Sequence, residues 1–120
     1  MTNHIHFIIG TNKDNLSDII RDFKKFTATK ITEAIEANPK DSRKNWMLWL
    51  LKKEESILFW QEGYHAEEII ELKFFNIKQD YIHFNPVRAG LVEKEEDYLY
   101  SSCGQIYGVR EGLLELVNFG

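Results

Sequence analysis

The chain has 120 residues, 43% of them hydrophobic, which suits one domain over residues 1–120 and is too short for two independent cores. No apolar run is long enough to span a membrane, no signal core follows the N-terminus, and the lone Cys103 excludes an internal disulfide, so we expect a cytoplasmic protein. The net charge of −4 argues mildly against a nucleic-acid-binding protein, although Lys and Arg are concentrated in residues 1–60.

The first predicted element is a strand over residues 3–9, where polar and apolar residues alternate around an apolar run. The second is a long amphipathic helix from Leu16 to Glu36, because its apolar residues recur at roughly helical spacing. Asn15 or Ser17 can cap its N-terminus. The clearest break in the chain follows at residues 38–42, where Asn-Pro-Lys-Asp-Ser predicts a turn within the domain.

The central part of the chain has a less regular pattern. A second helix is predicted from Arg43 to Glu55, and a short strand over residues 57–61. Residues 68–71 fit either a short strand or the start of a helix, and the pattern does not decide between them. The third helix is predicted over Lys73 to Phe84, whose aromatic and apolar residues lie near one stripe.

Pro86 disfavours helical geometry at the residue before it, so the third helix is expected to end at Asn85. The order strand, helix, helix, strand, helix predicts an α+β fold with few strands. Because a sheet needs about three strands or more to be stable alone, this order leaves it short of an element at its N-terminal end.

Two pairs of residues carry most of the chemical information. His4 and His6 are two apart in the predicted strand, so they share a face and can bind one metal ion together. Tyr81 and Asn85 are four apart in the predicted helix and also share a face. The amide oxygen of Asn85 is a neutral, hard ligand that suits Mg²⁺ or Mn²⁺. From the residues alone the structural interpretation prevails, with exposed strand histidines, a core tyrosine and a helix-capping asparagine.

The other two histidines are interpreted as structural. His83 lies roughly 200° around the helix axis from Tyr81 and should face away from it. His65 follows a predicted turn, where a surface or hydrogen-bonding role is expected. Among the basic residues, four are candidates for contacts with DNA phosphates, and a solvated surface role is the alternative for each: Arg21, Lys24, Lys25 and Arg88.

Five segments of the chain resemble the single-tyrosine HUH transposases, including the group associated with repetitive extragenic palindromes. They occur in the family's order: Met1–His6, Lys24–Thr27, Trp60–His65, Tyr81–Val92 and Asp97–Ser102. This resemblance implies a ferredoxin-like sheet with helices on one side. Family members carry a further strand and helix before the first motif, so we expect the domain to lack its first strand and helix.

The resemblance also implies a function and assigns roles to the residues above. His4, His6 and Asn85 would bind a divalent metal, Mg²⁺ or Mn²⁺, and Tyr81 would be the catalytic nucleophile. The family acts on single-stranded DNA, often beside a hairpin, and forms a 5′-phosphotyrosine bond that a 3′-hydroxyl can reverse without ATP. The expected function is therefore transposase-like cleavage and rejoining of single-stranded or hairpin DNA.

Loss of the first strand would expose an edge of the sheet with unpaired backbone groups. We therefore expect a homodimer that forms through this edge. Two other hypotheses stay open: a catalytically inactive, truncated remnant that only binds DNA, and a small structural α+β protein that binds a metal incidentally.

Overall fold

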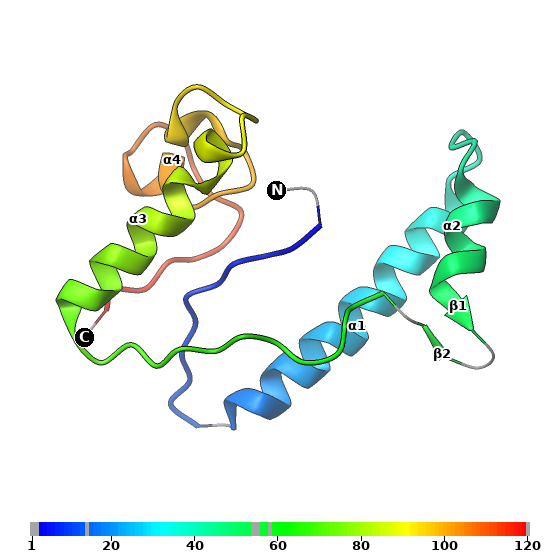
Figure 1. Cartoon of the computed structure of the whole chain (residues 1–120), viewed down its shortest axis with the longest axis horizontal. Helices are drawn as coiled ribbons and strands as arrows, with labels where there is room; N and C mark the ends of the chain where they lie inside the picture. Colours follow the sequence, from blue (N-terminus) through cyan, green and yellow to red (C-terminus); the bar gives the residue numbers. More distant parts are fainter. Residues whose placement is uncertain (1–2, 14, 54–55, 58, 120) are drawn as a thin grey trace. The chain divides into compact units, whose positions relative to one another are not determined.

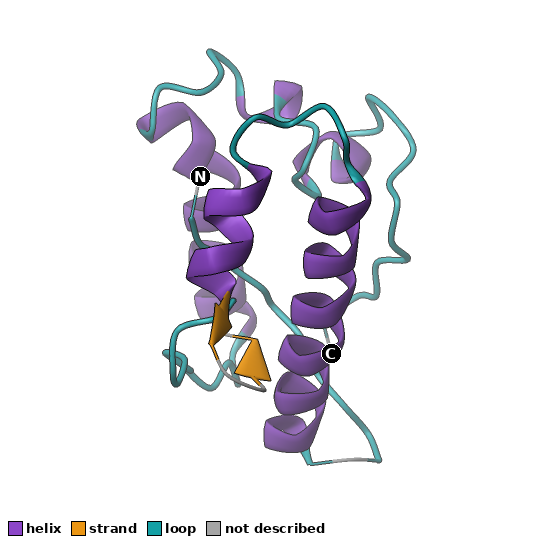
Figure 2. Cartoon of the chain, turned by 90° about the vertical axis from the view of Figure 1, so that its right-hand side faces the viewer, coloured by secondary structure: helices purple, strands orange, loops and turns teal. Residues whose placement is uncertain are grey.

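The computed structural model describes residues 3–13, 15–53, 56–57 and 59–119. The chain forms two compact units, one of Ile9–Ala66 and one that joins Met1–Ile8 to Glu67–Gly120. Helices account for nearly all the regular structure that is described, as the colouring of Figure 2 makes plain.

The Ile9–Ala66 unit is built on the long helix α1 (Leu16–Ala37) (Figure 1). Asn15 caps this helix, because its side-chain oxygen accepts a hydrogen bond from the Ser17 N–H at 2.8 Å. The helix ends at Ala37, and Asn38 follows as its cap with the extended backbone that a following proline favours. The predicted helix is thus confirmed to within one residue.

Helix α2 (Lys44–Leu51) packs against α1 and is shorter than predicted. It leads into β1 (Lys52–Lys53) and β2 (Ser56–Ile57), an antiparallel pair in which Lys52 lies opposite Ile57. The strand predicted over residues 57–61 is wrong from residue 59 onward, and residue 58 lies outside the described part of the chain.

Three side chains of α1, those of Phe23, Lys24 and Thr27, contact the turn that follows β2. The indole N–H of Trp60 donates to the hydroxyl of Thr27 at 2.9 Å, and the ring of Trp60 lies 5.9 Å from that of Phe23. The ammonium of Lys24 donates to the main-chain carbonyls of Gln61 at 3.2 Å and Gly63 at 2.5 Å. Two segments that carry the family resemblance, Lys24–Thr27 and Trp60–His65, therefore contact each other.

The second unit is organised around α3 (Leu72–Arg88). Pro86 does not end this helix, contrary to the prediction, and the actual end is set by Gly90 at φ +75°. The N–H of Leu91 bonds to the Pro86 carbonyl at 2.9 Å, and the N–H of Gly90 to the Val87 carbonyl at 3.0 Å. This is the Schellman arrangement, which satisfies the last carbonyls of a helix and needs a left-handed residue such as glycine.

Two short helices, η1 (Glu95–Asp97) and α4 (Cys103–Ile106), pack beside one another at the C-terminal end of α3. Arg110 links them, because its guanidinium donates to the main-chain carbonyls of Glu96 at 2.5 Å and Tyr98 at 2.6 Å. That guanidinium lies directly against Gly104, where an added Cβ would be 2.5 Å from the guanidinium carbon. The absence of a side chain at Gly104 is what lets Arg110 hold η1 and α4 together.

The predicted α+β, ferredoxin-like fold is wrong. Within the described ranges, β-structure is limited to β1 and β2, each two residues long. The strand predicted at residues 3–9 has no regular secondary structure and pairs with no other described segment. A strand needs a hydrogen-bonding partner from elsewhere in the chain, whereas a helix satisfies its own backbone, so alternation alone was a weaker predictor than helical spacing. Residues 68–71, left undecided, are neither strand nor helix.

Candidate active site

The N-terminal segment presents its two histidines as neighbours. The rings of His4 and His6 have centroids 5.1 Å apart and stand nearly perpendicular, at 89°. The chain runs without helical turns here, so residues two apart still point to the same side even though no strand forms. The Nδ1 of His4 is hydrogen-bonded to the side-chain oxygen of Asn3 at 2.7 Å, and His6 is half-buried whereas His4 is exposed.

Helix α3 supplies the other two members of the cluster, Tyr81 and Asn85, one turn apart on one face. The Nε2 of His6 lies 3.4 Å from the amide nitrogen of Asn85. The ring of His6 stands 5.8 Å from that of Tyr81, edge to face at 88°. All four side chains singled out from the sequence, His4 included, thus gather within one compact unit.

One pair of atoms in this cluster has the spacing of two ligands of one divalent cation. Two ligand atoms that each lie about 2.1 Å from one ion are roughly 3.0–3.4 Å apart, and the 3.4 Å between the His6 ring and the Asn85 amide matches that spacing. The oxygen and nitrogen of an amide have nearly the same shape, so a half-turn of the Asn85 amide presents its oxygen instead. No group of three or more His, Cys, Asp or Glu gathers among the described residues, and the role of Asn85 as a third ligand stays a prediction.

The protonation state of His6 also suits a ligand. Burial, with a smaller contribution from the neighbouring His4 ring, lowers the pKa of His6 below its ordinary value. A lowered pKa keeps the imidazole neutral at neutral pH, which is the form that binds a metal. Asn3 was not picked out from the sequence. The hydrogen bond between the Asn3 side-chain oxygen and His4 Nδ1 orients the His4 ring, as hydrogen-bonding groups around a metal ligand commonly do. The sequence signal for this role is an asparagine directly before the His-x-His pair.

Three of the four predicted DNA contacts lie on α1 in one compact unit, and Arg88 lies on α3 in the other. Arg21 is paired with Asp18 at 2.9 Å and Asp22 at 3.0 Å, and Lys24 is bonded to the turn after β2. Lys25 is exposed on α1. Their role in binding DNA stays a prediction.

His83 has the structural role expected of it. It is 3% exposed, and its Nε2 is hydrogen-bonded to the hydroxyl of Ser102 at 3.0 Å. Burial lowers the pKa of His83, and the nearby carboxylates of Asp80 and Glu95 oppose that shift. The hydrogen bond between His83 and Ser102 also connects α3 to the segment Asp97–Ser102, which is part of the family resemblance. His65 is exposed, in agreement with a surface position.

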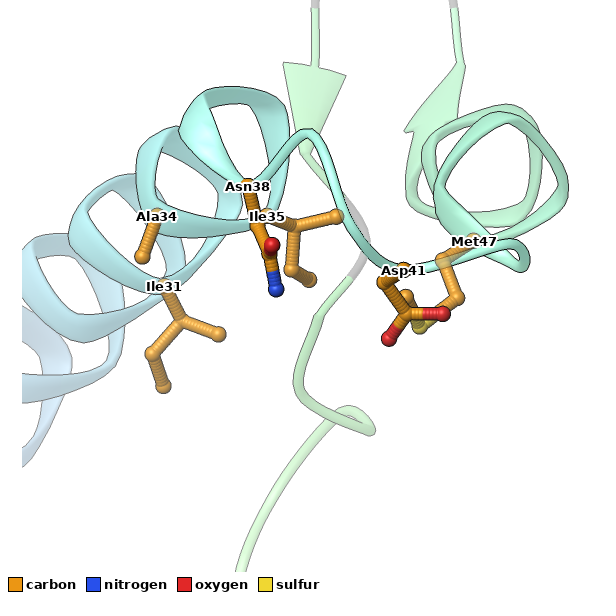
Figure 3. Close-up of a pocket in the computed structure, with 6 residues that line it drawn as sticks. All are labelled: Ile31, Ala34, Ile35, Asn38, Asp41 and Met47. Carbon is orange, nitrogen blue, oxygen red and sulfur yellow. The ribbon is translucent and has the colours of Figure 1, made fainter.

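A separate hollow lies in the Ile9–Ala66 unit, at the turn between α1 and α2 (Figure 3). It measures about 260 Å³ and is lined by Ile31, Ala34, Ile35, Asn38, Asp41 and Met47. The carboxylate of Asp41 accepts hydrogen bonds from Arg43, which lower the pKa of Asp41 and commit it to the turn. The hollow therefore offers an apolar wall and no group poised for catalysis.

The chain matches no family model, no curated protein and no solved structure at a significant level. The likeness to HUH transposases therefore depends on the five sequence segments alone. Of the helices formed by residues whose placement is described, none is both long and apolar enough to cross a membrane.

Proposed function

We propose that this protein is a metal-dependent, transposase-like endonuclease that cleaves and rejoins single-stranded or hairpin DNA through Tyr81. One observation carries the proposal: the contact of His6 with Asn85, 79 positions further along the chain, beside the ring of Tyr81. An imidazole pair, a carboxamide and a phenol in one cluster form a set of groups suited to cutting a phosphodiester. The proposal depends on this cluster and needs no ferredoxin-like sheet.

The reaction is the one that the family resemblance implies, and the groups present are suited to it. The oxygen of Tyr81 attacks the scissile phosphorus, the bond from phosphorus to the 3′ oxygen breaks, and that oxygen leaves with a proton as a 3′-hydroxyl. Tyr81 is 51% exposed, so its phenolic proton can pass to solvent. His4, His6 and Asn85 would hold Mg²⁺ or Mn²⁺, which when bound withdraws charge from a phosphate oxygen. The phosphotyrosine bond conserves the energy of the broken bond, so a second 3′-hydroxyl can reverse the step.

The polarity of the covalent bond gives a direct test. Random-sequence single-stranded oligonucleotides that carry a hairpin are labelled at one end and incubated with the protein and Mn²⁺. A label at the 3′ end is expected to migrate with denatured protein, and a label at the 5′ end to appear in a shortened free strand. EDTA should prevent both. Retarded DNA without any covalent product would instead favour the DNA-binding remnant, and neither signal would refute both proposals.

We also propose that the protein acts as a homodimer in the cytoplasm, where Cys103 would remain a thiol. Ile5 and Phe7 support the dimer, because each of these apolar side chains is 50% exposed. A second copy of the chain can cover both side chains and remove them from water. Light scattering over a range of concentrations is expected to give twice the chain mass, and Ile5→Lys with Phe7→Lys should shift the mass to that of one chain. A single-chain mass at every concentration would contradict the dimer.

A further inference from the structure

The nucleophile candidate Tyr81 is contacted by a second residue of its own helix. Arg88 lies seven residues after Tyr81 on α3, two turns along, so both lie on nearly the same face. The guanidinium carbon of Arg88 lies 4.6 Å from the centre of the Tyr81 ring, well inside the range of a cation–π contact. The same guanidinium donates a hydrogen bond to the main-chain carbonyl of Tyr81. Arg88 thus contacts both the ring and the main-chain carbonyl of Tyr81.

The position of Tyr81 is constrained from another direction by His6, whose ring stands edge to face with it at 5.8 Å. A phenol that is 51% exposed on a helix otherwise has several side-chain rotamers open to it. Contacts with Arg88 and with His6 together favour the rotamer that keeps the phenol beside the imidazole–amide cluster. Fixing that rotamer before DNA binds removes an entropic cost from the reaction.

We propose that Arg88 is a positioning residue, which holds the Tyr81 ring beside His6 and Asn85 so that the phenol is aligned for attack. The inference rests on the proposed function and deepens it. It differs from a phosphate contact, for which the positive charge alone is sufficient. A positioning role needs the planar guanidinium, which stacks its face on the Tyr81 ring and donates a hydrogen bond from its edge to the Tyr81 carbonyl. A lysine ammonium has no planar face and does not make both contacts in this way.

Three variants separate the two roles. Arg88→Met removes the charge and the planar group, and Arg88→Lys keeps the charge alone. Lys73→Met, on the exposed first turn of the same helix, removes one positive charge elsewhere and serves as the matched control. Binding of the labelled single-stranded pool and the rate of adduct formation at saturating DNA are measured for each, with helix content by circular dichroism to show that the fold is kept.

For a positioning residue, both Arg88 variants are expected to slow adduct formation at saturating DNA by about 10- to 100-fold, in keeping with the cost of a small misplacement. Their DNA affinity should stay close to that of Lys73→Met. If Arg88→Lys restores the rate and the loss in Arg88→Met lies in affinity, Arg88 is a phosphate contact and the proposal is overturned.

A second measurement does not depend on activity. In the DNA-free protein, the nuclear Overhauser effect between the ring protons of Tyr81 and His6 reports their closeness, and it is expected to weaken in Arg88→Met and in Arg88→Lys. An unchanged effect in both variants would overturn the proposal. If the unaltered protein forms no adduct, the proposed function fails, while the nuclear Overhauser comparison still decides whether Arg88 positions Tyr81.

Discussion

Replacing Tyr81 with phenylalanine is expected to reduce the covalent protein–DNA adduct to background. Phenylalanine lacks the oxygen that would join to phosphorus, and no partial reaction replaces a missing nucleophile. The contacts described around Tyr81 involve its ring and its main-chain carbonyl. The ring meets His6 edge to face and lies under the guanidinium of Arg88, and the carbonyl accepts a hydrogen bond from Arg88. Phenylalanine keeps the ring and the carbonyl, so the fold and the binding of DNA should persist.

Tyr100→Phe is the matched control for this loss. Tyr100 belongs to the same compact unit and is 79% exposed, so its phenol is even more accessible than that of Tyr81. If accessibility alone made a tyrosine reactive, Tyr100 would carry the DNA. Adduct yield is measured on denaturing gels, and the modified peptide is identified by mass spectrometry. An adduct that survives in Tyr81→Phe, or that maps to the peptide containing Tyr100, would remove Tyr81 from its role.

Local signals in the sequence were enough to predict that α1, α2 and α3 exist, although the short helices η1 and α4 were not predicted. The cap at Asn15 and the proline after Asn38 act within a few residues of the helix ends, and helix α1 begins and ends accordingly. The end of α3 shows the limit of one local rule. The rule that a proline ends a helix predicts an end at Asn85, but a proline in the last turn costs only one hydrogen bond. Gly90 instead supplies the left-handed turn that closes the helix.

Contacts between distant segments were beyond local reasoning. The predicted strand at residues 3–9 needed a partner, and the pattern of the segment itself does not say whether one exists. The meeting of His6 with Asn85 likewise has no basis in spacing and was expected from the family resemblance alone. By contrast, the stacking of Arg88 on Tyr81 follows from a separation of seven residues in a helix, so it was open to prediction and was missed.

Removing one imidazole should strongly weaken metal binding. We expect His6→Ala to lower the affinity for Mn²⁺ in the absence of DNA by at least about 100-fold. Mutating a residue that only hydrogen-bonds to a metal ligand already lowers metal affinity by about 10- to 100-fold. His65→Ala is the control, because His65 is exposed and belongs to the Ile9–Ala66 unit, whereas the cluster belongs to the other unit. Titration calorimetry or the electron paramagnetic resonance of free Mn²⁺ measures both at neutral pH. Equal losses in the two variants would indicate adventitious binding to surface histidines.

Asn85→Asp distinguishes a metal ligand from a structural hydrogen bond. If the amide oxygen of Asn85 binds the ion, a carboxylate in its place supplies a charged oxygen donor, and Mn²⁺ should bind more tightly than to the unaltered protein. If Asn85 instead serves as a donor to the His6 ring at 3.4 Å, a carboxylate cannot donate, and the affinity for Mn²⁺ should not rise. Asn85→Leu loses both functions and should bind Mn²⁺ weakly. A tighter aspartate variant together with a weak leucine variant would identify Asn85 as the third ligand, whereas an unchanged affinity in both would exclude it.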